Sequence, residues 1–450
     1  MYTGAENLLG SLFLLPLELD GSFQTDQEEC EVIVLKEAEL NFQEEEGSVE
    51  SVVGGILKSV RDGGDEAVLA YTEKFDGVRP SSLRIGKDEM RSAYKEVPPS
   101  TVKTLEFAAE RIRNFALRQK SCMQELRYEI SPGVTLGHRL LPVESCGCYV
   151  PAGRYPLPSS ALMSAIPAKV AGVRRIAACS PAGKGRDGIH PAVLVAMDIA
   201  GVDEVYCMGG AQAIAAFAYG TETIEGVDII VGPGNRYVTE AKRQVSGAVG
   251  IDMLAGPSEV VILADESANP EWVAADALAR CEHDPNSWTV LVTTSRRLGE
   301  SVMSAVEMQA ALLSTGEFAL ESWRNNGRVL LAESLDEAVA ITNDIAPEHL
   351  QVMTADSSAT ASKLINFGSL FIGEYAPVVF GDYASGPNHI LPTVRCARFS
   401  NGVYVGTFLR VCSYQELTAE GAGSLAGPCA DFAEMEGLFG HKRSAEIRAR

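Results

Sequence analysis

The stretch Glu204-Val205-Tyr206-Cys207-Met208-Gly209-Gly210-Ala211-Gln212 decides the fold of this chain. It begins with a short apolar run over residues 204–208, which is typical of a buried strand. Two glycines follow, and residues 211–219 then have the apolar character and length of a helix. A buried strand that leads through a glycine turn into a helix predicts one unit of a parallel sheet covered by helices.

The same alternation of strand and helix recurs on both sides of this stretch. Short connections between such elements imply parallel strands with helices on both faces of the sheet. The sequence therefore predicts the α/β fold class, with two doubly wound, Rossmann-like domains, mostly parallel sheets and a small C-terminal helical segment. Further strands are expected at 148–150, 175–179, 228–231, 259–263, 288–292, 328–331, 350–353 and 369–372, and further helices at 51–77, 102–117, 191–200 and 236–245.

Composition narrows the class of protein. The chain has 450 residues, with 38 basic and 60 acidic side chains and a net charge of −22. Without a basic tract, nucleic acid and anionic membranes are poor partners. No apolar run approaches the roughly 20 residues that span a bilayer. The ten cysteines are scattered without a CxxC pair, which favours reduced thiols in a cytoplasmic enzyme. With nucleic acid and membranes excluded, a small-molecule substrate is the expected partner.

Three glycine loops lie next to predicted strands. They are Gly209-Gly210-Ala211-Gln212, Gly232-Pro233-Gly234-Asn235 and Ala255-Gly256-Pro257-Ser258-Glu259. In doubly wound sheets, ligands bind beyond the carboxyl ends of the strands, where glycine lets the backbone approach them. A helix start also offers free amide donors to phosphate. No loop is a complete GxGxxG motif, and any one could be a plain tight turn. Together they favour a nucleotide or another phosphate-like ligand.

A second set of residues has the chemistry of an acid–base or metal site. Glu348 and His349 are adjacent after a helix-like segment, so their side chains diverge and can serve two different protons. His283, His389 and His441 lie in polar or glycine- and proline-flanked settings, as does Asp382. Such nitrogen and oxygen donors could hold zinc, although ordinary hydrogen-bonded histidines explain the same pattern.

From about Val53 to the C-terminus the chain resembles the histidinol dehydrogenase family. The resemblance rests on many specific motifs in one order. They are residues 149–151, 209–216, 232–235, 237–244, 251–259, 282–285, 346–350, 381–383 and 388–393.

The resemblance implies a zinc-containing homodimer that oxidises a primary alcohol through an aldehyde to a carboxylate with two NAD+. Glu348 would activate the water that attacks the aldehyde, and His349 would take the alcohol proton. Tyr149, Gln212 and Asn235 match NAD contacts. The matching substrate contacts are Ser258, His283, His349, Asp382, His389, Glu436 and His441. Zinc would hold the substrate's imidazole and amine through His283, Asp382 and His441, the last supplied by the partner subunit.

The sequence and the resemblance together predict a division of the chain. Residues 1–47 are expected to form an acidic, poorly structured N-terminal arm. Residues 48–148 and 258–402 make a discontinuous α/β domain that carries the catalytic and metal residues. The NAD-binding domain covers 149–257, and 403–450 form a small dimerisation segment.

One departure from the family bears on the metal. The fourth zinc ligand in the family is a glutamine three residues before the ligand histidine, and here Arg280 holds that position. A guanidinium is permanently charged and has no lone pair for a metal. Three readings follow: zinc binds through three ligands, zinc is absent, or Arg280 pairs with an anionic group of a different substrate.

The substrate has two readings. L-Histidinol is the first. The alternative is another polar alcohol such as 2,3-dihydroxypropane-1-sulfonate, because Arg154-Tyr155-Pro156 and the short segment between Gln244 and Ile251 resemble a paralogous branch. A third possibility, a binding protein that has lost catalysis, is opposed by the intact Glu348 and His349.

Overall fold

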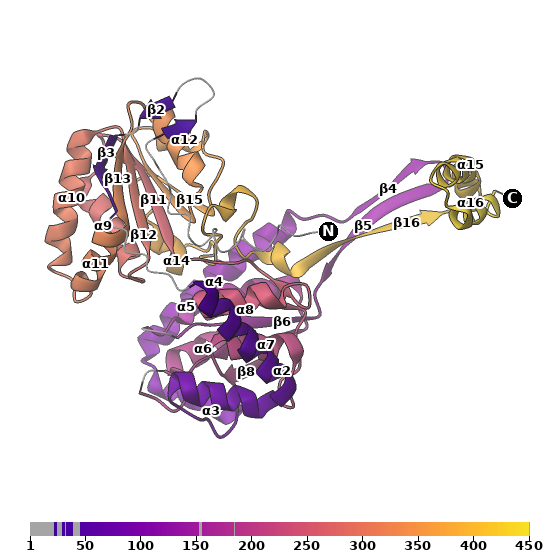
Figure 1. Ribbon diagram of the computed structural model, residues 1–450, viewed down its shortest axis with the longest axis horizontal. Coiled ribbons are helices and arrows are strands. Elements are labelled where there is room, and N and C mark those ends of the chain that lie inside the picture. Colours follow the sequence, from indigo (N-terminus) through magenta and orange to yellow (C-terminus); the bar gives the residue numbers. More distant parts are fainter. Residues whose placement is uncertain are drawn as a thin grey trace.

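The structure is a computed structural model that describes residues 22–24, 29–31, 33–38, 46–152, 155–183 and 185–449. Figure 1 shows two sheets covered by helices and a long ribbon that extends away from both. None of the described helices combines the length and the apolarity needed to cross a membrane. The predicted α/β class with mostly parallel sheets and a C-terminal helical segment is confirmed.

The first sheet is wholly parallel and has the strand order β10-β9-β6-β7-β8. Its strands are β6 (Ser145–Tyr149), β7 (Arg175–Ser180), β8 (Glu204–Cys207), β9 (Ile229–Val231) and β10 (Gly250–Ile251). The helices between them are α5 (Pro158–Ala171), α6 (Pro191–Ala200), α7 (Gly210–Tyr219) and α8 (Arg236–Val245). The three helices predicted here from the alternation are all present.

The strands β6, β7, β8 and β9 each contribute side chains to two cores, one on each face of the sheet. Cys146 and Cys148 of β6 lie in a core with α4, α5 and α6, whereas Tyr149 lies in a second core with α2, α7 and α8. Consecutive side chains of a strand point to opposite faces, and both faces are covered. The strands are therefore apolar throughout rather than alternating.

The helices before this sheet belong with it. They are α2 (Glu46–Asp76), α3 (Lys87–Glu96) and α4 (Pro99–Ser121). α2 packs on α7 and α8, α3 on α6, and α4 on α5 and α6. The expected grouping of 48–148 with 258–402 therefore needs correction. The apolar stripes of α2 and α4 complete the two cores of the first sheet, and neither reaches the cores of the second.

The second sheet has the order β15-β14-β11-β12-β13-β3. Its parallel strands are β11 (Glu259–Ala264), β12 (Trp288–Thr293), β13 (Gly327–Leu331), β14 (His349–Met353) and β15 (Ser369–Ile372). On one face lie α9 (Pro270–Cys281), α10 (Arg296–Ala310) and α11 (Gly316–Asn326), with their own core. On the other lies α12 (Leu335–Ile345). α13 (Ser357–Ala361) and α14 (Val378–Tyr383) flank β14 and β15 in sequence.

The expected N-terminal arm lies mostly outside the described residues, and its described part corrects the expectation of little structure. β1 (Ser22–Gln24) and β2 (Glu29–Glu31) pair antiparallel, and β3 (Ile33–Lys36) joins the second sheet antiparallel to β13. The run Ile33-Val34-Leu35 has the β-branched, apolar character of a strand, and Leu35 packs against the core beneath α10.

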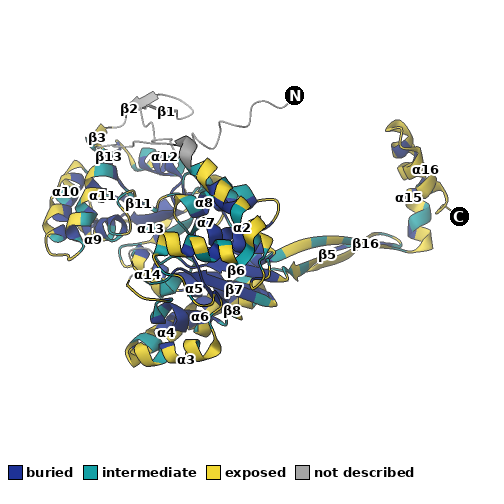
Figure 2. Ribbon diagram, turned by 60° about the horizontal axis from the view of Figure 1, so that its bottom comes forward, coloured by how far each residue is buried: buried dark blue, intermediate teal, exposed yellow. Residues whose placement is uncertain are grey.

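The ribbon is an antiparallel sheet of three strands that carries two helices at its tip (Figure 1). β5 (Val134–Pro142) pairs with β4 (Leu126–Ser131) and with β16 (Leu409–Leu417). α15 (Ala419–Met435) and α16 (Phe439–Glu446) follow β16 and pack on each other, while two 3₁₀ turns, Cys396–Arg398 and Val405–Phe408, lead into it. Figure 2 shows the strands of the ribbon as mostly exposed or half-buried, in contrast to the buried strands of the first sheet.

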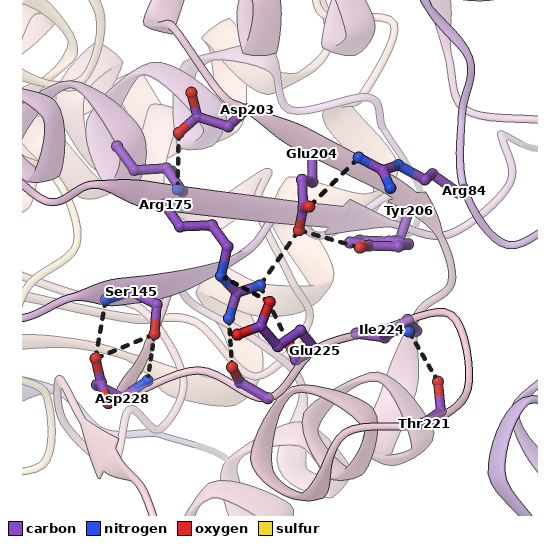
Figure 3. Close-up of polar contacts among 12 residues, drawn as sticks. Arg84, Ser145, Arg175, Asp203, Glu204, Tyr206, Thr221, Ile224, Glu225 and Asp228 are labelled. Carbon is purple, nitrogen blue, oxygen red and sulfur yellow. Dashed lines mark hydrogen bonds and ion pairs between the residues drawn. The ribbon is translucent and has the colours of Figure 1, made fainter.

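The amino ends of the first sheet are held by side-chain contacts (Figure 3). Arg175, at the start of β7, donates to Glu204 of β8 over 3.2 Å and to the carbonyl of Gly226. The hydroxyl of Ser145 donates to Asp228 over 3.1 Å, and the amide of Asp228 donates back to that hydroxyl over 3.0 Å. These contacts tie neighbouring strands together at the edge opposite the glycine loops.

Candidate active site

The first sheet reverses its strand order between β6 and β9, and the glycine loops gather there. From β6 the chain moves outward through β7 to β8, and then returns to place β9 on the other side of β6. Tyr149 ends β6, and Gly232 directly follows β9. In open α/β sheets the crevice at such a reversal is where ligands bind. The expected cofactor residues therefore lie at the edge that the topology favours.

Gly232 has a structural reason to be glycine. Its φ is +120°, and a Cβ there would collide with the backbone of Tyr149. Behind the loop, Lys242 forms an ion pair with Asp252, and both side chains are almost fully buried. Lys242 also donates to the carbonyl of Gly232 over 2.9 Å, and Asp252 accepts from the amide of Gly232 over 2.8 Å. This pair fixes both backbone groups of Gly232.

The three residues expected to bind NAD surround this edge. The amide of Gly210 donates to the hydroxyl of Tyr149 over 3.1 Å, which ties the end of β6 to the start of α7. Gln212 is fully buried, and within the described chain neither its amide oxygen nor its amide nitrogen has a hydrogen-bond partner. Asn235 caps α8 by accepting from the amides of Tyr237 and Val238. Gln212 thus keeps its polar atoms free for a ligand.

A short linker, residues 252–258, carries the chain from the first sheet to the second. Thr239 of α8 donates to the carbonyl of Ala255 over 2.8 Å, and the amide of Gly256 donates to the hydroxyl of Thr393. The third glycine loop lies in this linker and precedes its strand, β11. The third loop therefore differs from the first two, which follow their strands, because the linker enters β11 at its amino end.

The expected catalytic pair lies at the amino ends of the central strands of the second sheet. β11 and β14 are neighbours at the point where this sheet reverses its order, with Val260 opposite His349. Glu348 immediately precedes β14 and Glu259 begins β11, so the two glutamates face each other across the strand starts. Figure 1 shows α14, which carries Asp382, near the boundary between the two sheets.

The two glutamates hold each other's backbone. The amide of Glu259 donates to Oε2 of Glu348 over 2.7 Å, and the amide of Glu348 lies 3.4 Å from Oε2 of Glu259. Glu259 also accepts from the amide of Val394 over 2.8 Å. Burial, with the negative charge of Glu348 second, raises the pKa of Glu259 to about 8. At neutral pH the carboxyl group of Glu259 is therefore mostly protonated.

Two strained residues frame this pair. Ala346 and Val394 have positive φ angles of 50° and 52°. A left-handed backbone costs roughly 1–3 kcal/mol for such residues. Ala346 ends α12 just before Glu348, and the amide of Val394 reaches Glu259. The two strained residues thus lie where they set the positions of the Glu348 and Glu259 side chains.

His349 is almost fully buried; its Nδ1 is hydrogen-bonded, whereas its Nε2 has no hydrogen-bond partner among the described residues. Nδ1 lies 3.0 Å from the carbonyl of Glu259, and a carbonyl only accepts, so Nδ1 carries the proton. Nε2 lies 3.4 Å from Oδ1 of Asp382. Burial and Arg280 lower the pKa of His349, but the carboxylates of Glu348 and Asp382 outweigh them and raise it. The imidazole therefore exchanges protons through Nε2.

The remaining residues of the main body that are expected to contact the substrate lie around His349. His389 Nδ1 donates to the carbonyl of Asp382 over 2.9 Å. Ser258 directly precedes Glu259, and its carbonyl accepts from Trp288 over 2.9 Å. His283 follows α9 at the rim of this group, where part of its surface reaches solvent. The protein packed around the rest of the residue, together with the charge of Arg280, lowers the pKa of its imidazole. Burial lowers the pKa of His389.

Glu436 and His441 are not brought to this group within one chain. Glu436 ends α15 and His441 lies in α16, both exposed at the tip of the ribbon. Figure 1 shows that tip far from α14. A protomer by itself therefore holds only part of the expected site.

The expected zinc ligands do not fit a metal as they stand. Oδ2 of Asp382 faces Arg280 Nη2 at 3.4 Å and Oδ1 faces His349 Nε2 at 3.4 Å, so both carboxylate oxygens are engaged. Within the described chain, no three His, Cys, Asp or Glu side chains are arranged to hold a metal ion. A buried guanidinium occupies the position of a ligand and cannot donate a lone pair. We therefore derive no step through a metal.

Sequence reasoning missed Glu259, Lys242 and Asp252 as parts of the site. Glu259 and Asp252 stand in or near the third glycine loop, which was the available signal for them, whereas Lys242 lies within α8. Glu259 lies 89 residues before its partner Glu348 in the sequence. Lys242 lies ten residues before its partner Asp252. Only the strand order brings the glutamates together.

Comparisons with known proteins agree with this architecture. The family model described as histidinol dehydrogenase matches residues 40–449. The histidinol dehydrogenase of Agrobacterium fabrum is 46% identical over 402 residues, which are 89% of this chain and 92% of that protein. A histidinol dehydrogenase homolog of Shouchella clausii is 41% identical over 413 residues, covering 92% of this chain and 97% of its own.

A solved structure extends the likeness to three dimensions. The crystal structure of histidinol dehydrogenase from Elizabethkingia anophelis superposes with a TM-score of 0.86 at 35% identity, covering 91% of this chain and 94% of that one. At this coverage both the sequence and the fold point the same way, and the chain belongs to the histidinol dehydrogenase family.

Proposed function

We propose that this protein is an NAD-dependent dehydrogenase that oxidises L-histidinol through the aldehyde to L-histidine. The observation that carries the proposal is the arrangement of Glu348 and His349, two proton-transfer groups held at the strand starts that adjoin the first sheet. Its family is NAD-dependent, and its relatives are described as histidinol dehydrogenases. None of the relatives named above carries a description that points to a sulfonated alcohol.

The first step needs a base for the alcohol proton. Because Nδ1 of His349 donates to the carbonyl of Glu259 over 3.0 Å, the neutral ring presents its lone pair at Nε2. Nε2 takes the hydroxyl proton while the carbon gives a hydride to NAD+, which yields the aldehyde and NADH. Asp382, 3.4 Å from Nε2, stabilises the imidazolium that forms.

The second step needs a nucleophile from water. Glu348 takes a proton from a water molecule that attacks the aldehyde carbon, and the hydrate then gives a second hydride to another NAD+. The products are the carboxylate and a second NADH. The amide of Glu259 holds Oε2 of Glu348 in place.

The cofactor would lie at the reversal point of the first sheet, within the proposed NAD-binding region of 149–257. Tyr149, Gln212 and Asn235 would contact it there. Gln212 gives the firmest support, because a fully buried amide with no partner in the described chain is costly unless a ligand satisfies it. Bound at this edge, NAD would face the amino ends of β11 and β14 across the linker.

We infer a homodimer in which each tip completes the other protomer's site. Phe432, Met435 and Phe439 are 65%, 73% and 66% exposed, and they lie on the same two helices as Glu436 and His441. Apolar exposure of this kind marks an interface. A tip seated on a second copy would bury these side chains and bring both expected substrate residues to the partner's site.

The nine cysteines whose side chains are described are free thiols. Free thiols at this number fit a reducing compartment, and we place the enzyme in the cytoplasm.

The test is NADH formation by the purified dimer, with NAD+ and either L-histidinol or 2,3-dihydroxypropane-1-sulfonate. The proposal expects turnover of L-histidinol and formation of histidine, with the sulfonate left unreacted. Turnover of the sulfonate alone would overturn the substrate assignment while leaving the reaction class intact. Protein lacking both activities, although folded and dimeric, would overturn the proposed function.

A further inference from the structure

Arg280 lies where a charged side chain is least expected, in the interior beside Asp382. It is in the last turn of α9, and only 5% of its surface is exposed. A cation near the carboxyl end of a helix is favoured by the helix dipole. α9 packs against α14, and this contact brings Arg280 Nη2 to 3.4 Å from Oδ2 of Asp382.

This contact is the charge compensation that Asp382 needs. A buried carboxylate is costly unless a cation or several hydrogen bonds satisfy it. Oδ2 faces Arg280 and Oδ1 faces His349. The negative charge of this carboxylate is therefore compensated by side chains of the same protein, Arg280 and His349.

The same contact works against a metal ion at Asp382. A divalent cation there would need an oxygen of Asp382, and it would lie beside a guanidinium that never loses its proton. In the protein interior, a divalent cation bound to Asp382 and the neighbouring guanidinium of Arg280 would repel each other strongly. For a divalent cation to bind Asp382, the side chain of Arg280 would have to leave its buried position beside that carboxylate.

A second observation shows that not all hydrogen-bond donors of Arg280 have an acceptor. Its Nε is buried and has no hydrogen-bond partner among the described residues. A guanidinium offers five N–H donors, and a buried donor without an acceptor is costly. The donor is available for a substrate atom that carries a lone pair, such as a hydroxyl oxygen or an imidazole nitrogen.

We propose that Arg280 takes the place of a metal ion in this protein: it neutralises Asp382, excludes divalent cations and donates a hydrogen bond to the substrate. The inference rests on the proposed function only for the identity of that substrate. The exclusion of metal concerns this chain's own residues and holds whatever alcohol is oxidised.

The experiment measures metal on the protein and does not depend on turnover. Full-length wild-type dimer, Arg280→Gln and Arg280→Lys are dialysed against chelator, then against buffer with a small excess of Zn2+, and finally against buffer alone. Retained zinc is measured by mass spectrometry, and thermal unfolding is followed with and without Zn2+. Arg280→Gln removes the charge and supplies an amide oxygen as ligand, whereas Arg280→Lys is the matched control that keeps the cation.

The proposal expects wild type and Arg280→Lys to retain little zinc and to show no zinc-dependent rise in Tm. Arg280→Gln should retain zinc stoichiometrically and gain thermal stability with it. Stoichiometric zinc on the wild type, or on Arg280→Lys, would overturn the exclusion. A metal-free wild type whose Arg280→Gln variant also stays metal-free would overturn the assignment to Arg280.

Activity separates this inference from the proposed function. A wild type that oxidises L-histidinol equally well in excess chelator supports both. A metal-free wild type that oxidises no L-histidinol overturns the proposed function and leaves the inference about Arg280 standing. Loss of turnover in chelator, restored by Zn2+, overturns the inference and leaves the function standing.

Discussion

The amide of Glu259 donates a hydrogen bond of 2.7 Å to Oε2 of Glu348, across the starts of two neighbouring parallel strands. This bond holds one carboxylate oxygen in place. It also brings the buried carboxyl group of Glu259 beside that of Glu348, and burial with this neighbouring charge raises the pKa of Glu259. Both consequences can be tested by changes that preserve the shape of the side chains.

Glu348→Gln should separate the two oxidation steps. Glutamine can still accept from the amide of Glu259, but it cannot take a proton from water. Conversion of aldehyde to carboxylate should fall by about 10²–10⁴-fold, while alcohol oxidation persists. The measurement is NADH formation from L-histidinol and, separately, from L-histidinal. An equal loss on both substrates would contradict the assignment of Glu348 to the second step.

His349→Gln should instead impair the first step. The ring lone pair at Nε2 is lost, so we expect alcohol oxidation to fall by about 10²–10⁴-fold. Oxidation of added L-histidinal should suffer less. His138→Gln, at a half-buried histidine on the ribbon strand β5, is the matched control and should leave both rates near wild type. Unchanged alcohol oxidation in His349→Gln would rule out His349 as the base.

Glu259 should make the protein less stable as pH rises. Its pKa is raised from 4.5 to about 8 in the folded state, so folding binds a proton between these values. The stability it contributes is fully present below pH 4.5 and is lost as pH rises through 8, on the order of a few kcal/mol. Glu259→Gln should flatten this dependence. Urea unfolding of wild type and variant across this range measures it, and parallel pH profiles would refute the shift.

The buried pair of Lys242 and Asp252 should support both stability and cofactor binding. Lys242→Met leaves Asp252 as an uncompensated buried charge and frees the carbonyl of Gly232, so we expect a loss of about 3–5 kcal/mol. NAD affinity should fall as well. Lys169→Met, which breaks the exposed pair with Asp203, is the control and should cost at most about 1 kcal/mol. Urea unfolding and NAD titration measure the two effects, and equal small losses would contradict the role of the buried pair.

A shared site predicts complementation between inactive subunits. His441→Ala leaves Glu348 intact, and Glu348→Gln leaves His441 intact. In a heterodimer of the two, one site has both native residues. Equal mixing after dissociation should therefore restore about a quarter of wild-type activity. Activity no greater than the sum of the two parents would contradict the partner's contribution.

Much of the two sheets could be predicted because their strands are buried on both faces. The helices expected at 191–200 and 236–245 coincide with α6 and α8, and the strand at 369–372 coincides with β15. In these segments the apolar run, the following turn and the helical pattern all predict the same strand–turn–helix unit of a parallel sheet. Agreement at several levels is what makes a local pattern reliable.

The ribbon could not be predicted in the same way. β4 and β16 are largely exposed along their length, so neither shows the apolar alternation that burial on one face produces. β5 pairs with β16, which lies more than 260 residues later in the chain, and no local pattern encodes such a pairing. The packing of α2 on α7 was also missed, because an apolar stripe does not reveal which sheet it will cover.

The site shows the same division. Glu348 and His349 stand out because they are adjacent, and Arg280 stands out by departing from the family pattern. The proximity of Glu259 to Glu348, and of Asp382 to His349, follows from strand order and from the placement of α14. These contacts decide which group holds a proton, and they become visible only in the folded chain.

The most direct test of the central claim is the stoichiometry of a single reaction. Purified protein is given a limiting amount of L-histidinol with excess NAD+, and both NADH and histidine are quantified at completion. Two NADH for each histidine, with no free aldehyde, are expected from a four-electron oxidation in which Glu348 and His349 act in turn. One NADH for each histidinol, with the aldehyde released, would contradict the assignment of both steps to this site.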